Sequence, residues 1–174
     1  MTPPDESERA GMLRVDHAGE VGATRIYAGQ LAVLGSRHPI ARAIAGMAAQ
    51  EERHRLRFDA MLAERRVRPT ALGPLWHVAG FALGAATALI GPEAAMACTA
   101  AVETEIDRHY GAQLERLGSS DPELSEAIAD FQAEELEHRD AALAAGAEQA
   151  PAYTLMSAAI RLGCRLAIGL SERI

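Results

Sequence analysis

The chain has 174 residues, of which 49% are hydrophobic and only 4% aromatic, and its formal net charge is −7. This length fits one domain with a sizeable core, and the shortage of aromatic residues favours helices over sheets. The negative charge argues against a nucleic-acid partner, and the two distant cysteines, Cys98 and Cys164, argue against a disulfide framework, a zinc ribbon or an iron–sulfur site.

Helix breakers divide the chain into six predicted helices, with no strand signal and no linker. The acidic, proline-containing stretch MTPPDESER at the start lacks the features of a targeting segment, and we expect residues 1–7 to be disordered. All six helices are expected to form a single all-α domain, residues 1–174. The predicted helices span approximately residues 8–34, 36 or 38 to 66, 72–90, 92–118, 120 or 121 to 146, and 151–170.

Two of these helices have specific predicted beginnings. The second helix is expected to hold Pro39 in its first turn, where a missing N–H costs nothing. Ser120 or Asp121 is expected to cap the fifth helix, and Glu123 can close a capping box on Ser120.

The stretch LGPLWHVAGFALGAATALI, residues 72–90, is apolar nearly all round. Nineteen helical residues reach about 28 Å, slightly less than the ~30 Å hydrocarbon core of a bilayer, and the stretch contains Pro74 and several glycines. We therefore expect it to cross the bundle between two parallel-related helical hairpins and not to span a membrane. Together with residues 158–170 it can form an apolar surface that lies on a membrane.

Two Glu-x-x-His pairs are the first indication of a functional site. Glu51 and His54 lie in QEERH, and Glu135 and His138 lie in EELEHRD. The spacing puts a carboxylate and an imidazole on one face of a helix. One such pair alone is typical of a solvated helix surface. The positions of the two pairs relative to the other glutamates are therefore the stronger evidence for a site.

Glutamates from four helices are predicted to share one layer of the bundle. Glu20 and Glu51 lie 16 and 15 residues from a predicted turn near residue 36. Glu103 and Glu135 each lie 16 residues from a second predicted turn near residue 119. Each glutamate is therefore about 24 Å from its turn. The second hairpin also repeats the spacing of the first. Glu103 follows Glu20 by 83 residues, and Glu135 follows Glu51 by 84.

Four carboxylates and two imidazoles directed into a helical bundle are typical of a dinuclear iron or manganese site. These ligands favour iron or manganese over zinc, which more usually binds thiolates or several histidines. A metal-free interaction protein would have to bury four carboxylates that repel one another. We therefore predict six metal ligands: Glu20, Glu51, His54, Glu103, Glu135 and His138.

Five further residues are candidates for contacts with the ligands or the substrate. Tyr27 and Tyr110 each follow a predicted ligand by seven residues, and they either hydrogen-bond into the site or pack in the core. Gln50 and Glu134 are expected to contact the histidine of the opposite hairpin, because a ligating histidine donates its other N–H to an acceptor. His109 lies about 120° round the helix from the nearest ligand, so we expect it to meet the substrate and not the metal.

Gly19 and Gly22 flank Glu20 inside a helix, where each costs about 1 kcal/mol relative to alanine. Close helix packing would explain both glycines. A passage for a flat ring would explain them equally well, so both interpretations stay open at this point.

Several long stretches resemble the demethoxyubiquinone hydroxylases of ubiquinone biosynthesis. The resemblance covers residues 13–174 and includes RVDHAGEVGATRIYAGQLAVL, QEERH, RVRPTALGPLWHVAGFALGAATALIG, AMACTAAVETEIDRHY and EELEHRD. It implies a ferritin-like four-helix bundle with two additional helices. It also implies a di-iron monooxygenase that hydroxylates the ring of a polyprenylated demethoxyubiquinol with O2. The iron-ligand positions of the family fall on the six predicted ligands, without substitution.

On this resemblance, the expected cofactor is a di-iron centre with two Fe ions per chain. The expected partners are O2, a membrane-confined polyprenyl quinol and a membrane surface, with other ubiquinone-biosynthesis proteins or a second copy of the chain as further candidates. The expected location is the cytoplasmic face of the bacterial inner membrane, as a peripheral protein. The alternative is a ferritin-like iron-binding protein or ferroxidase without an organic substrate, against which the apolar segment 72–90 argues.

Overall fold

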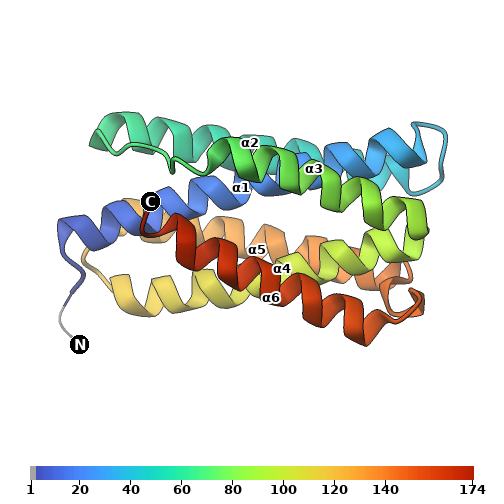
Figure 1. The fold of residues 1–174 in the computed structure, drawn as a ribbon. Coiled ribbons are helices and arrows are strands. Elements are labelled where there is room, and N and C mark those ends of the chain that lie inside the picture. The colour runs from blue at the N-terminus through green and yellow to red at the C-terminus, as the bar shows by residue number, and fades with distance from the viewer. Residues whose placement is uncertain (1–2) are drawn as a thin grey trace.

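The computed structural model describes residues 3–174, and within this range it contains six α-helices, one short 3₁₀-helix and no strand. The helices pack into one elongated bundle (Figure 1). This confirms the predicted all-α class and the number of helices. In chain order, the elements are α1 (Glu6–Leu34), α2 (Ala41–Arg65), α3 (Gly73–Ile90), α4 (Pro92–Leu117), α5 (Pro122–Ala144), η1 (Ala147–Gln149) and α6 (Tyr153–Ser171).

Two helical hairpins form the bundle. α1 packs against α2 and α4 packs against α5, while α3 lies along α1 and α6 lies along α4 (Figure 1). The 18 residues of α3 carry the chain back along the length of the bundle, over about 27 Å. α4 therefore begins at the end where the first hairpin turns, and the two hairpins turn at opposite ends (Figure 1). The expectation of parallel-related hairpins is wrong for this reason.

The first helix begins earlier than predicted. Asp5 accepts the backbone N–H of Glu8, and the Glu8 carboxylate accepts the backbone N–H of Asp5, which completes a capping box. Residues 6 and 7 of the segment expected to be disordered are therefore helical. The first two residues of that segment lie outside the described range.

The start of α2 also differs from the prediction. Pro39 lies before the helix and not in its first turn. The residues ahead of α2 form a turn in which the backbone N–H of Ala41 donates to the carbonyl of His38 at 2.9 Å. This turn uses residues that the sequence pattern assigned to the helix.

Asp121 caps α5 by accepting the backbone N–H of Leu124 at 3.2 Å, as one of the two predicted caps. Glu123 does not close the predicted capping box. Its carboxylate instead pairs with Arg57 and Arg65 of α2, each at 2.9 Å. Partners from another hairpin therefore replace a local backbone contact.

Glycines allow α1 and α3 to approach closely. A Cβ atom at Gly84 would lie 1.9 Å from the carbonyl oxygen of Ile26, and one at Gly29 would lie 2.2 Å from the carbonyl oxygen of Phe81. Because backbone atoms occupy these positions, no side chain fits there. The crossing holds α3 directly against the helix that carries Glu20.

We predict that Gly84→Ala separates α1 from α3 and lowers the free energy of unfolding by about 1–3 kcal/mol, as other overpacked sites do. Thermal denaturation followed by circular dichroism measures the change. Gly46→Ala in α2 is the matched control, because no atom lies within 4 Å of its Cβ position. Equal melting temperatures for the two variants would contradict the close crossing.

Candidate metal centre

The six predicted ligands meet in the middle of the bundle. They come from α1, α2, α4 and α5, and each is at most 3% exposed. Their ligand atoms form two groups, and within each group the atoms lie within 4.8 Å of one another. The first group is Glu20, Glu51, His54 and Glu135, and the second is Glu51, Glu103, Glu135 and His138.

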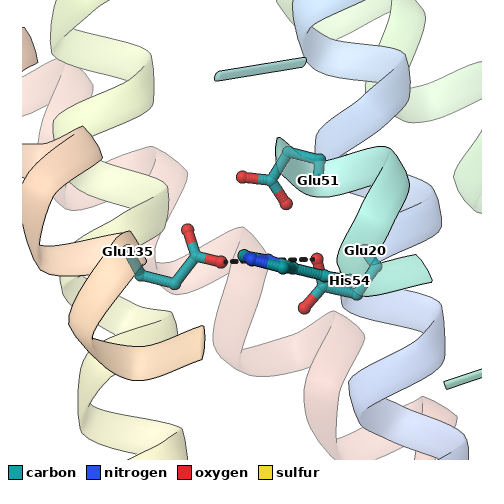
Figure 2. A group of neighbouring side chains, drawn as sticks. All are labelled: Glu20, Glu51, His54 and Glu135. Atoms are coloured by element: carbon teal, nitrogen blue, oxygen red, sulfur yellow. Dashed lines mark ion pairs between the residues drawn. The ribbon is translucent and has the colours of Figure 1, made fainter. Parts of the chain in front are cut away.

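Both histidines direct Nδ1 toward the centre. Figure 2 shows the first group, in which ion pairs join His54 to Glu135 and Glu20. His54 Nδ1 lies 3.1 Å from Glu135 Oε1 and 3.5 Å from Glu20 Oε2. In the second group, His138 Nδ1 lies 3.1 Å from both Glu51 Oε1 and Glu135 Oε2. Each imidazole thus faces two carboxylates.

The other nitrogen of each histidine points to a residue of the opposite hairpin. His54 Nε2 lies 3.2 Å from Glu134 Oε2, and His138 Nε2 lies 3.0 Å from Gln50 Oε1. Gln50 Nε2 donates to Glu134 Oε2 at 3.0 Å, which connects the two contacts. Acceptors at these positions keep the proton on Nε2 and leave Nδ1 available to bind a metal.

Two buried tyrosines connect the hairpins. The Tyr27 hydroxyl donates to Glu103 Oε1 at 2.9 Å, and the Tyr110 hydroxyl donates to Glu20 Oε1 at 2.5 Å. Each tyrosine therefore contacts the glutamate of the opposite hairpin and not the one seven residues before it. Burial and the neighbouring carboxylates raise the pKa of both phenols well above the ordinary value, so both remain donors.

The charges of the cluster are strongly coupled. Burial and the neighbouring carboxylates raise the pKa of Glu51 and of Glu103 well above the ordinary value. Burial opposes the ionisation of Glu135, but hydrogen bonds to His138 and His54 outweigh it and lower the pKa to about 2. Burial also opposes the charge on His54, but close contacts with carboxylates, led by Glu135, raise its pKa to about 10. Protons therefore balance part of the negative charge.

Four buried polar atoms at the centre have only ion-pair contacts within the cluster and make no well-aligned hydrogen bond: Glu20 Oε2, Glu51 Oε1, His54 Nδ1 and Glu135 Oε1. Such atoms are rare in folded proteins and costly to leave unsatisfied. All four atoms belong to residues of the first group. Carboxylate oxygens and an imidazole nitrogen at this spacing are the donors that iron and manganese bind in helical bundles. The residues therefore fit metal ions.

A cavity of about 500 Å³ lies between α1, α3, α4 and α6. Its walls are mostly apolar, and Gly19, Gly22 and Ile106 are among the lining residues. Tyr110 also lines the cavity and connects it to the metal centre through its bond to Glu20. The cavity thus offers an apolar molecule a position beside the ligands.

His109 lines the cavity and is not among the residues of the two ligand groups. Its Nε2 lies 2.9 Å from Gln113 Nε2 and 3.4 Å from Asp16 Oδ1. Asp16 and Gln113 are both buried, and burial raises the pKa of the Asp16 carboxyl. The sequence reasoning missed this pair. The one pattern in the sequence that could have indicated a role for Asp16 is its position, one helical turn before Glu20.

The outer faces of α3 and α6 are apolar. By length and composition alone, both helices could cross a membrane, which is weak evidence of membrane association. Only 22% of α3 and 11% of α6 is buried in the bundle. The exposed hydrophobic side chains are Leu75, Val78, Leu89 and Ile90 on α3, and Leu155, Leu162, Leu166 and Leu170 on α6.

Relatives of known activity cover nearly the whole chain. A 3-demethoxyubiquinol 3-hydroxylase of Rhodospirillum rubrum is 59% identical over 162 residues, which are 93% of this chain and 76% of the relative. The NADPH-dependent 3-demethoxyubiquinone 3-hydroxylase of Homo sapiens is 53% identical over 94% of this chain and 76% of its own length. The 5-demethoxyubiquinone hydroxylase of Saccharomyces cerevisiae is 44% identical over 94% and 77%, respectively.

The match to a family is equally extensive. Residues 7–171 match the family described as ubiquinone biosynthesis protein COQ7. This range includes the six residues of the candidate metal centre and the whole of the two apolar helices. The chain therefore belongs to the COQ7 family of ubiquinone biosynthesis proteins.

Proposed function

We propose that this protein is a 3-demethoxyubiquinol 3-hydroxylase, which uses two iron ions and O2 to hydroxylate the ring of a polyprenylated demethoxyubiquinol. One observation carries the proposal: a member of the COQ7 family places two buried, overlapping Glu/His groups beside an apolar cavity. A ferritin-like iron store needs no such cavity. We infer that the whole chain, residues 1–174, acts as one catalytic domain.

In this proposal, each iron has its own ligands and the two share others. Glu20, Glu51 and His54 would hold one iron, and Glu103, Glu135 and His138 would hold the other. Glu51 and Glu135 belong to both groups of residues, so these two carboxylates would contribute to holding both ions. When bound, the iron pair supplies the electrons and the Lewis acidity needed to use O2.

The surrounding residues keep the ligands in place. Glu134 and Gln50 hold the outer imidazole protons, so each histidine presents Nδ1 to the centre. Tyr110 occupies Oε1 of Glu20, which leaves Oε2 for a metal. Tyr27 occupies Oε1 of Glu103 in the same way. These contacts restrict which oxygen of each carboxylate faces the metal.

The cavity and the apolar helices suit a substrate that resides in a membrane. α3 and α6 line the cavity with their inner faces and expose leucines on their outer faces. A prenyl chain can therefore remain in apolar surroundings between the bilayer and the metal centre. We place His109 against the quinol ring, because it is the imidazole that lines the cavity. We place the protein on the cytoplasmic face of the inner membrane, as a peripheral protein.

We predict that Glu135→Ala abolishes both iron binding and hydroxylation, because it removes a carboxylate that both ligand groups share. Purified protein is expected to fall from about two irons per chain to none, and ferrous iron is expected to stop raising its melting temperature. A strain that lacks its own hydroxylase is expected to accumulate the demethoxy precursor when it carries the variant.

Glu137→Ala is the matched control, because Glu137 is exposed on the same helix. It is expected to keep the iron and to restore ubiquinone, as the unmodified chain does. Iron content and quinone extraction measure the two effects separately. Wild-type hydroxylation by Glu135→Ala would reject the proposed ligand set, and an unmodified chain that restores no ubiquinone would reject the proposed substrate.

We predict that metal binding releases protons. The raised pKa values of Glu51, Glu103 and His54 mean that these groups hold protons to a higher pH than usual, and a divalent metal must displace those protons. About two to three protons per chain are expected, and affinity is expected to fall as pH falls, because protons and metal compete. Anaerobic titration calorimetry with manganous ion, in buffers of different ionisation enthalpy, counts the protons. A binding heat that is independent of the buffer would contradict the assigned protonation.

We predict that the double variant Leu162→Glu with Leu166→Glu binds vesicles at least tenfold more weakly, because each leucine contributes roughly 1.5–3 kcal/mol when buried. Co-sedimentation with vesicles of phosphatidylcholine and phosphatidylglycerol measures binding. Leu56→Glu is the control, because Leu56 is 53% exposed on α2, away from the apolar helices. Vesicle binding that is equal in both variants would exclude α6 as a membrane contact.

A further inference from the structure

The glycines of α1, α3 and α6 differ in the space that surrounds their Cβ positions. At Gly29, Gly80 and Gly84, a Cβ atom would lie 2.7 Å or less from a backbone atom of another helix. At Gly22 and Gly163, no atom lies within 4 Å of the Cβ position. Helix packing therefore requires the first three glycines but does not require the other two.

Gly22 and Gly163 share a second property, because both line the cavity. Gly22 is half-buried on α1, and Gly163 is exposed on α6 beside Leu162. The cavity therefore reaches the surface next to the apolar face of α6. A glycine inside a helix is less stable than alanine, and neither residue recovers this loss through packing. The free space beside each glycine is what a side chain would remove.

We propose that Gly22 and Gly163 are specificity-determining residues, which keep the cavity wide enough for a ring that carries a long prenyl chain. This inference rests on the proposed function, because it takes the cavity as the substrate site. A side chain at either position would enter the cavity and leave space for a ring with a short substituent only. The two glycines thus select ligands by the length of the chain that accompanies the ring.

A binding experiment tests this without turnover. Trp76 is the single tryptophan of the chain and lines the same cavity, so quenching of its fluorescence reports binding. The full-length, iron-loaded protein is titrated anaerobically with two fully substituted benzoquinones, one with a decyl chain and one with a methyl group in its place. Gly22→Leu and Gly163→Leu are each expected to bind the decyl probe about tenfold more weakly, and to bind the methyl probe within about threefold of the unmodified chain.

Two controls match the variants. Gly46 in α2 and Gly169 in α6 also have no atom within 4 Å of the Cβ position, and neither lines the cavity. Gly46→Leu and Gly169→Leu are expected to bind both probes as the unmodified chain does. The smaller change Gly22→Ala is expected to raise the melting temperature by about 2–4 °C while it weakens binding of the decyl probe. Greater stability with weaker binding excludes misfolding as the cause.

The outcomes separate this inference from the proposed function. If the two cavity variants bind the decyl probe as tightly as the controls, or lose both probes equally, the role of the glycines is wrong. Hydroxylation by the unmodified chain would then still support the proposed function. If the unmodified chain binds neither probe and restores no ubiquinone, the proposed substrate and this inference both fail.

Discussion

The burial of four carboxylates and two imidazoles at the centre of an apolar bundle is the constraint on which the rest of the structure depends. Buried carboxylates that lack partners repel one another and are costly. The raised pKa values of Glu51 and Glu103 favour their neutral forms, and the ion pairs of Glu135 with both histidines compensate its negative charge. Metal ions bound at the same positions would replace such protons. The orphaned oxygen and nitrogen atoms show where that exchange has room to occur.

The bundle separates two tasks between its faces. α2 and α5 supply both Glu-x-x-His pairs and the outer contacts made by Gln50 and Glu134. α3 and α6 contribute no residue to the metal groups and instead form one side of the cavity. α1 and α4 serve both tasks, since each carries a ligand glutamate and part of the cavity wall. A ligand can therefore enter beside α6 without disturbing the contacts that orient the histidines.

The layer of glutamates was predictable from spacing, although the predicted arrangement of the hairpins was wrong. Glu20 and Glu103 lie near the middle of their helices, so they remain level whichever end each hairpin turns at. The caps were harder to predict, because each depends on competing partners. Glu123, which the local pattern assigned to a capping box, pairs with two arginines of another helix. A local sequence pattern carries no information about charged residues that are distant in the chain.

By itself, the sequence determined the helical class, the number of helices and the six residues that share one layer. Periodicity and spacing specify the face and the height of a residue on its own helix. They do not specify which helix lies opposite. Only the tertiary structure decided that Tyr27 and Tyr110 bond across the hairpins, and that Glu51 and Glu135 belong to both ligand groups. The tertiary structure was also needed to distinguish the glycines that helix packing requires from the glycines that lie beside open space. This distinction depends on residues that are distant in the chain.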